Sequence, residues 1–499
     1  MKTRVITRAL AVLAAVAMLF SLSITALAAE PENPFPEGAW LVNLSNNSND
    51  VASCFSTFSV NAQNPDQIAV GWRMYGLPTN TKAGIGDWVG DFHLSVSDDG
   101  GKTFTEIDMM PYVRAVQKVD GLPQEEEYSM WWCNGPWATY DCNGTLYCGA
   151  ICYTALDLLD PEHPRQGRCL VMTSTDNGKT FNDATFGMRL DNFGEDAHGL
   201  AVSATRPSTT GIEVGQPGTD PWHTPWDGNF GRASATTDLF ISICGGNVVA
   251  SHDGAKTYEK VHSVKYPEGW SCGGGTMSID GNTIISPITV NSCPDESIEP
   301  GSMGVVISND DGLTWSEPMI AIAGSEVNNT TSVRQIRHPI SAASPAEPGH
   351  WAIATYTPDH LHAKVVYTED AGATWKSAET PFIEGYDDYT EARQVAVGYT
   401  TGGELVVMYR GFKTWCNYYV FAALLGEDGE FHKTVLAAPE ISTYPYETTQ
   451  GNYNNNNGSG DFCGFVSGND DYCFVDFPYS PDGVALDQYL AAIPLDAMR

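Results

Sequence analysis

One short segment that recurs five times constrains the fold of this 499-residue chain more than any other feature. Three copies read S-x-D-x-G-x-T-aromatic and span residues 97–104, 174–181 and 308–315. Two looser copies span 251–258, where Ala255 replaces the glycine, and 368–375, where Thr368 replaces the serine. The copies start 77, 77, 57 and 60 residues apart, which suits a unit of four strands and their loops.

Each copy has the chemistry of a tight turn between two strands. The aspartate can accept backbone N–H groups within the turn, and the glycine tolerates a positive φ. The threonine and the aromatic residue then begin the next strand, where the ring packs between neighbouring sheets. We therefore interpret the repeated aspartates as structural rather than catalytic.

This pattern is the Asp-box, and through its five copies the chain resembles the sialidase (neuraminidase) superfamily. The resemblance implies an all-β fold, a single closed β-propeller over residues 38–497 with four-stranded antiparallel blades. The strands around the copies predict seven blades. Sialidases have six, so six is the alternative count.

The count of seven blades includes three expectations about particular strands and turns. A strand near residues 40–44 is expected to complete the last blade and remove its open edge. The first two strands of the third blade are expected at 232–237 and 239–244, and those of the fourth at 276–279 and 283–289. The box of the sixth blade is expected to be reduced to residues 426–429.

The first 28 residues have the pattern of a secretory signal peptide. Lys2, Arg4 and Arg8 precede an apolar run over 9–20, and Ala26-Leu27-Ala28 resembles a cleavage site. The sequence predicts a secreted, extracellular protein, and no later apolar run is long enough to span a bilayer. We also expect a monomer.

The formal net charge of −35 at pH 7 restricts the partners, and removal of the leader makes it more negative. A field of this sign repels nucleic acid and anionic membranes, so neither is expected as a partner. Solubility outside the cell explains most of this charge.

Twelve cysteines in an exported chain suggest disulfides, with buried thiols as the alternative. One pair has a local argument. Cys463 and Cys473 flank the turn 467–471 and are expected to face each other across a hairpin.

The position of the repeats also separates two faces of the expected propeller. If the boxes join the third and fourth strands, the loops before first strands and between second and third strands lie on the opposite, top face. Binding sites on loops are expected there. The loops before first strands carry Trp132, Asn134, Arg232, Arg337, His338, Glu391, Arg393, Tyr453 and Asp461. The loops between second and third strands carry Arg73, Tyr75, Asp87, Asp91, His360, His362, Arg410 and Lys413.

Five arginines in this set, in so acidic a chain, favour an acidic ligand. Arg73, Arg232, Arg337, Arg393 and Arg410 are the expected substrate-binding residues, because a guanidinium presents a planar fork to a carboxylate. Trp132 and Trp226 are also expected substrate-binding residues, because their rings can stack on a sugar. The alternative is that each arginine pairs with a nearby acid and holds two blades together.

The segment from Thr390 to Arg410 resembles the glutamate-containing strand of the sialidases. The resemblance implies that Glu391 polarises a nucleophilic tyrosine, for which Tyr453 is the first candidate and Tyr389 the second. It also implies that Arg410 holds the substrate carboxylate and that Asp91 or Asp87 is the loop acid. The family's early Arg-Ile-Pro segment is missing, and the third member of its arginine triad has no equivalent.

The sequence thus predicts a secreted, sialidase-like glycoside hydrolase acting on an extracellular glycan with an acidic sugar. Two alternatives are a lyase for uronate polysaccharides, with His338 or Tyr453 as base, and a propeller that binds glycans or protein without catalysis. No cofactor or catalytic metal is expected. A structural calcium ion is left open, with Glu195, Asp196 and His198 as candidate ligands.

Overall fold

The described part of the chain folds into antiparallel sheets with almost no helix. The computed structural model describes residues 35–45, 52–75, 90–113, 131–154, 167–182, 185–190, 197–202, 239–243, 247–251, 262–275, 277–310, 312–328, 339–414, 417–443, 465–483 and 486–499. Within these ranges the strands form seven sheets, each with a path of four hydrogen-bonded strands.

The first three sheets follow one another along the chain. The first contains β2 (Ala52–Val60), β3 (Ile68–Tyr75), β4 (Gly90–Ser97) and β5 (Thr105–Asp108). The second contains β6 (Trp131–Tyr140), β7 (Leu146–Thr154), β8 (Gly167–Ser174) and β9 (Thr185–Leu190). The third contains β10 (Ala197–Val202), β11 (Leu239–Ile243), β12 (Asn247–Ser251) and β13 (His262–Ser263).

The next three sheets repeat the arrangement, two of them with one additional short strand. The fourth contains β14 (Ser271–Gly274), β15 (Ser278–Asp280), β16 (Thr283–Ser292), β17 (Met303–Ser308) and β18 (Met319–Ile322), followed by the short 3-10 helix η2 (Gly324–Glu326). The fifth contains β19 (Ile340–Ala343), β20 (Trp351–Tyr356), β21 (Ala363–Thr368) and β22 (Lys376–Glu379). The sixth contains β23 (Glu391–Tyr399), β24 (Leu405–Phe412), β25 (Asn417–Leu425), β26 (Phe431–Leu436) and β27 (Ser442–Thr443).

The seventh sheet joins the two ends of the described chain. It contains β28 (Phe465–Gly468), β29 (Tyr472–Tyr479), β30 (Asp487–Pro494) and the N-terminal β1 (Trp40–Asn43), and the 3-10 helix η5 (Leu495–Ala497) follows it. β1 pairs antiparallel with β30, with Trp40 opposite Ala492. The prediction that a strand near residue 40 completes the last sheet is therefore confirmed.

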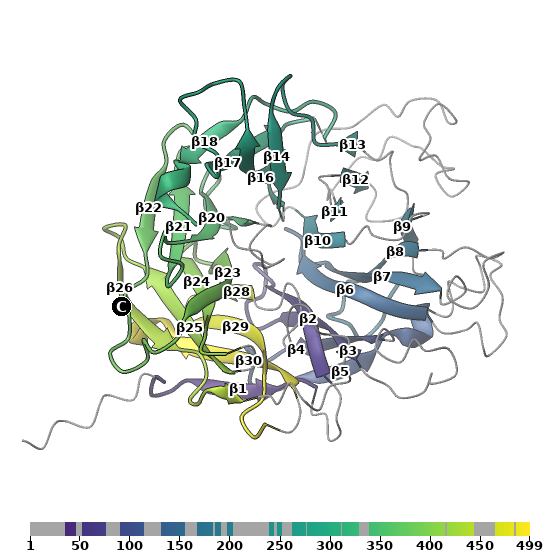
Figure 1. The fold of residues 1–499 in the computed structure, drawn as a ribbon. Coiled ribbons are helices and arrows are strands. Elements are labelled where there is room, and N and C mark those ends of the chain that lie inside the picture. Colours follow the sequence, from purple (N-terminus) through teal and green to yellow (C-terminus); the bar gives the residue numbers. More distant parts are fainter. Residues whose placement is uncertain are drawn as a thin grey trace, which may run out of the picture.

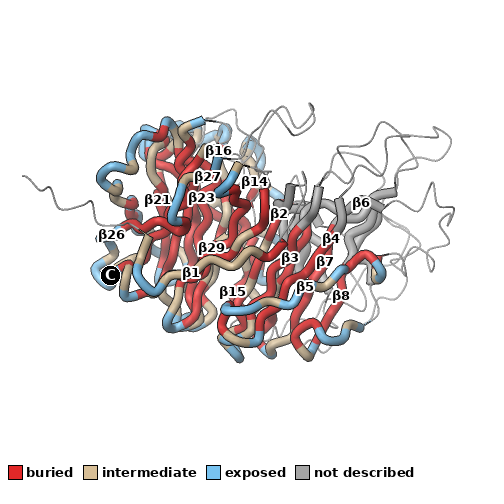
Figure 2. Tube along the Cα trace, turned by 90° about the horizontal axis from the view of Figure 1, so that it is seen from below, coloured by how far each residue is buried: buried red, intermediate tan, exposed pale blue. Residues whose placement is uncertain are grey.

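The sheets lie around a common centre (Figure 1). One strand from each sheet contacts one from the next, through β2, β6, β10, β15, β19, β23 and β28 in turn, and β28 contacts β2 again. Where burial is described, the residues of the strands are mostly buried and the exposed residues gather at the turns (Figure 2). The core thus consists of side chains packed between neighbouring sheets.

The third and fourth sheets depart from the expected strands. The strand paired with β11 is β10 (Ala197–Val202), so the prediction of 232–237 for that position is wrong. Arg232 lies outside the described residues, and the first strand of this sheet begins at Ala197, well before it. In the fourth sheet, β14 and β15 both pair with β16 in place of one strand at 276–279.

The expected disulfide between Cys463 and Cys473 is also wrong. A tight turn, in which Asn469 N–H donates to the Tyr472 carbonyl at 2.9 Å, places Gly468 opposite Cys473. Cys473 is a free, fully buried thiol, and burial raises its pKa. Cys463 lies outside the described residues, five positions before the residue that faces Cys473.

The repeats of the sequence form one kind of hydrogen-bonded turn, which we call the repeat turn. In the turn at 308–315, Ser308 Oγ accepts the Gly312 N–H at 2.8 Å. Asp310 accepts the N–H and the hydroxyl of Thr314 at 2.8 and 2.6 Å. The same bonds recur in the turns at 97–104, 174–181 and 368–375, each between the third and fourth strands of its sheet. The predicted chemistry of the turn is confirmed in these four copies.

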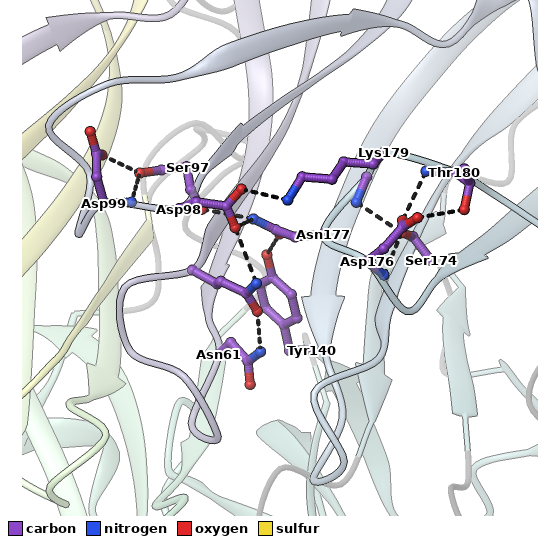
Figure 3. Close-up of polar contacts among 12 residues, drawn as sticks. Asn61, Ser97, Asp98, Asp99, Tyr140, Ser174, Asp176, Asn177, Lys179 and Thr180 are labelled. Carbon is purple, nitrogen blue, oxygen red and sulfur yellow. Dashed lines mark hydrogen bonds and ion pairs between the residues drawn. The ribbon is translucent and has the colours of Figure 1, made fainter.

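Adjacent repeat turns also contact each other across the first and second sheets (Figure 3). Asn177 Nδ2 donates to the Ser97 carbonyl and to Asp98 Oδ1, both at 2.8 Å. Lys179 lies 3.2 Å from the other oxygen of Asp98. The second residue of one turn therefore binds the fourth and sixth residues of the next.

We expect the repeat turns to make the melting temperature fall in acid. The Thr180 hydroxyl and N–H lower the pKa of Asp176 to about 2, and those of Thr374 lower the pKa of Asp370 to about 2. Because these pKa values lie below that of an unfolded aspartate, the stabilisation is complete above about pH 4 and is lost as the pH falls toward 2. Melting curves between pH 6 and 2 measure this. A variant with Asp176→Asn and Asp370→Asn should start lower at pH 6 and decline less, and an identical decline in both proteins would contradict the assignment.

Candidate functional site

The edge of the sheets opposite the repeat turns carries a cluster of ionisable side chains contributed by two sheets. At this edge the first strands begin and the second strands connect to the third. In the sixth sheet β23 starts there with Glu391, which lies opposite Phe412 at the end of β24. The repeat turns and the starts of the first strands therefore lie on opposite faces, as the position of the repeats predicted.

Glu391 is held by an arginine two residues along the same strand. Its Oε1 forms an ion pair with Arg393 Nη2, as expected for side chains that leave a strand on one side. Arg393 is 5% exposed and its guanidinium carbon lies 4.8 Å from the Phe412 ring centre, whereas Glu391 is 27% exposed. A carboxylate within reach of solvent is thus fixed by a buried cation.

His360, from the connection between β20 and β21, approaches Glu391 from the fifth sheet. Its Nδ1 lies 4.0 Å from Glu391 Oε2, and its ring lies 4.6 Å from the Tyr356 ring. Its carbonyl accepts the Ala392 N–H at 2.8 Å, which ties this connection to β23. Burial lowers the pKa of His360, Glu391 opposes this effect and Arg393 reinforces it. We call His360, Glu391 and Arg393 the Glu391 cluster.

One residue of this cluster and one directly beside it have a strained backbone. His360 has φ 65° and Gln394, directly after Arg393, has φ 53°, both in the left-handed region that non-glycine residues rarely occupy. Among the described residues only Asn177 and Ala371 share this feature, and both occupy the fourth position of a repeat turn. Strain of this kind is typical of functional sites, because the surrounding structure must hold it in place.

A β-bulge accounts for the strain at Gln394. The register of β23 against β24 shifts between Arg393 and Ala396, and Val395 N–H donates to the Tyr356 hydroxyl at 3.2 Å. Equivalent shifts occur in β2 and β6. Bulges re-aim side chains, and here the bulge immediately follows the Glu391–Arg393 pair.

Arg410 lies opposite Arg393 in the register but is directed into the protein. It is 0% exposed, and its guanidinium carbon lies 5.5 Å from the Phe412 ring centre and 4.8 Å from that of Tyr418. Burial raises the pKa of Asp476, on β29 of the seventh sheet, to about 7, although the Arg410 charge opposes this effect. This environment matches the alternative that an arginine stabilises the contact between two sheets.

The structure brings together only part of the expected site. Tyr389 was the second candidate to contact Glu391, and this is wrong, since its hydroxyl donates to the Leu361 carbonyl at 2.8 Å. Arg73, Asp91 and Trp132 lie on β3, β4 and β6, near the same edge by register. Tyr453, Asp87, Arg232, Arg337 and Trp226 lie outside the described residues, as do His338, Asp461, Glu195, Asp196 and residues 1–34.

Sequence reasoning did not single out three residues at this edge. His360 was one of many polar residues in the top loops, and only contact between sheets distinguishes it. Gln394 carries no sequence signal, because its strain follows from the bulge. Phe382 is a solitary phenylalanine in an acidic connection, a signal that could have been noticed.

The described part of the chain contains neither a candidate metal site nor a candidate membrane-spanning helix. No group of three or more His, Cys, Asp or Glu side chains there is arranged to hold a metal ion. No helix within the described ranges is both long and apolar enough to cross a membrane.

Comparison with known proteins gives structural similarity at low identity. No family model and no curated protein matches the chain. It is similar to a protein of unknown function from Dyadobacter fermentans, with 12% identity and a TM-score of 0.42 over 92% of this chain and 99% of that one. It is similar to Trypanosoma rangeli sialidase in complex with 2,3-difluorosialic acid, with 10% identity and a TM-score of 0.37 over 92% of this chain and 59% of that one. It is also similar to the Hadza microbial sialidase Hz136, with 14% identity and a TM-score of 0.37 over 90% of this chain and 66% of that one.

Proposed function

We propose that the seven sheets are the blades of one closed propeller and that the repeat turns are its Asp-boxes. The cyclic contacts between neighbouring sheets and the pairing of β1 with β30 support closure. The four equivalent turns, each between a third and a fourth strand, support the assignment of the repeats. The signal-peptide pattern of residues 1–28 supports export.

We further propose that this propeller is a secreted, sialidase-like glycoside hydrolase for a glycan with a carboxylate-bearing sugar. One observation carries the proposal: the two strained residues outside the repeat turns both border the Glu391–Arg393 pair. Strain, a bulge and a buried cation thus combine around one solvent-accessible carboxylate. No other place in the described chain combines these features.

In the proposed hydrolysis, each of two carboxyl groups carries out one proton transfer. Glu391 accepts the proton of the Tyr453 hydroxyl as the phenolate oxygen bonds to the anomeric carbon. Asp91 or Asp87 gives its proton to the departing glycosidic oxygen, and water then hydrolyses the tyrosyl intermediate. Arg73, Arg337 and Arg393 are the candidates to orient the carboxylate of the sugar.

A uronate lyase is the second candidate, and the approach of His360 to Glu391 favours it. Its Nε2 is buried and has no hydrogen-bond partner among the described residues, while its Nδ1 side faces Glu391. The base that takes the proton α to a uronate carboxylate is then His338 or Tyr453, since the buried Nε2 of His360 cannot reach a substrate. Glu391 stabilises an imidazolium formed beside it. The electron pair left on the sugar then expels the glycosidic oxygen.

Product analysis of the purified protein on sialosides and on uronate polysaccharides separates these reactions. A hydrolase releases a saturated acidic sugar and incorporates oxygen from labelled water. A lyase gives an unsaturated product, which absorbs in the ultraviolet, without that label. If neither product forms while the glycan still binds, the chain is a binding module and both enzyme proposals fail.

A further inference from the structure

A second feature at the same edge is an exposed aromatic ring beside the Glu391 cluster. Phe382 lies in the connection between β22 and β23, which leads from the fifth sheet directly to Glu391. It is 45% exposed, and Leu313 is the one other large apolar side chain with comparable exposure in the described chain. Leu313 belongs to a repeat turn at the opposite edge.

The connection that carries Phe382 is fixed at both ends. The Pro381 carbonyl accepts the Thr434 hydroxyl at 2.7 Å, which ties its start to the sixth sheet. Near its end, Tyr389 donates to the Leu361 carbonyl at 2.8 Å and Thr390 N–H donates to the Phe412 carbonyl at 2.9 Å. A backbone held this way loses little conformational freedom when a ligand covers the Phe382 ring.

Two histidines of one turn join this ring to the candidate site. His360 lies against Glu391, as described above. His362, two residues later, has its ring centre 3.5 Å from that of Phe382. Burial lowers the pKa of His362. The exposed phenylalanine therefore packs against the turn that also carries His360 of the Glu391 cluster.

The charge around the ring restricts its ligand. Glu384, Asp387 and Asp388 are exposed on the same connection. One cation beside this connection, Lys413, is already engaged in an ion pair with Asp388, which also accepts the Tyr419 hydroxyl at 3.3 Å. An acidic sugar is repelled here, whereas the C–H face of a neutral pyranose can stack on the ring.

We propose that Phe382 is a stacking platform for a neutral pyranose, the sugar adjacent to the carboxylate-bearing sugar in the glycan. This inference rests on the proposed function for the identity of that neighbour. The site accordingly distinguishes two consecutive sugars by charge, with the acidic one at the arginines and the neutral one at Phe382.

Binding of lactose to the full mature protein tests the platform without any need for catalysis. In saturation-transfer and titration NMR, Phe382→Ala should raise the Kd for lactose about tenfold, the effect expected from loss of one stacking ring. Leu313→Ala, which removes the other exposed apolar side chain, should leave the Kd unchanged. Phe382→Trp should restore or tighten binding.

Two outcomes overturn the platform. One is lactose binding that is equal in the wild type and in Phe382→Ala, and the other is a wild type that does not bind lactose. Neither depends on glycan cleavage, so an inactive protein that binds lactose through Phe382 would defeat the proposed hydrolase and leave the platform standing. In an active protein, Phe382→Ala should raise KM for a substrate with a lactose leaving group and not for its methyl glycoside.

Discussion

Glu391→Gln should lower turnover on an accepted glycan by about 10² or more in a protein that still folds, although loss of the ion pair with the buried Arg393 lowers its melting temperature. The amide keeps the size of the side chain and can no longer accept a proton from a phenol or stabilise an imidazolium. The change therefore affects both reactions considered for this site. Initial rates at saturating substrate, together with thermal melting, measure the two quantities separately.

Glu404→Gln is the matched control for this substitution. Glu404 is also an ion-paired carboxylate, 2.8 Å from Arg499, and it directly precedes β24 at the end of the sheet remote from Glu391. It should leave turnover unchanged. If Glu391→Gln retains full activity, the carboxylate has no catalytic role and the site must be sought among other residues of this edge.

The repeat turns could be predicted almost completely from the sequence because their interactions are local. The serine, aspartate, glycine and threonine of one copy lie within seven consecutive positions, and each hydrogen bond joins residues at most four apart. Such contacts form whatever the rest of the fold does. β1 could be placed in the last sheet for a different reason, since an N-terminal strand was needed to complete that sheet.

The first strand of the third sheet could not be found in the same way. β10 and β11 pair although 36 residues separate the end of one at Val202 from the start of the other at Leu239. Reading the nearest strand-like stretch before Leu239 assumes a short connection, and the chain does not provide one here. The expected Cys463–Cys473 pair failed for a related reason, since a tighter turn than expected fixed the register.

The candidate site was predictable where it depends on one strand and unpredictable where it depends on two sheets. Glu391 and Arg393 share a face because they are two residues apart. The approach of His360 depends on how the fifth sheet packs against the sixth, and no periodicity in the sequence encodes that contact. The left-handed conformations of His360 and Gln394 are consequences of the same packing.

Arg410→Met should lower the free energy of unfolding by about 3 kcal/mol, because it removes the buried positive charge that opposes the burial penalty of the Asp476 carboxylate. The guanidinium lies over Phe412 and Tyr418, which belong to the cluster shared by the sixth and seventh sheets, and its charge acts on the buried Asp476. Methionine fills a similar volume without the charge, so the pKa of Asp476 should rise further. Urea denaturation at pH 7 measures the change in stability.

Arg499→Met is the control, and the same measurements distinguish a structural role of Arg410 from a substrate-binding role. Arg499→Met removes an exposed arginine that pairs with Glu404 and Asp496, and it should change the free energy of unfolding by less than about 0.5 kcal/mol. If Arg410 held the substrate carboxylate, as the sialidase resemblance implies, Arg410→Met would keep its stability and raise KM for acidic glycans. Because its side chain has no exposure to solvent, we expect the opposite pattern, a less stable protein whose folded fraction retains the KM of the wild type.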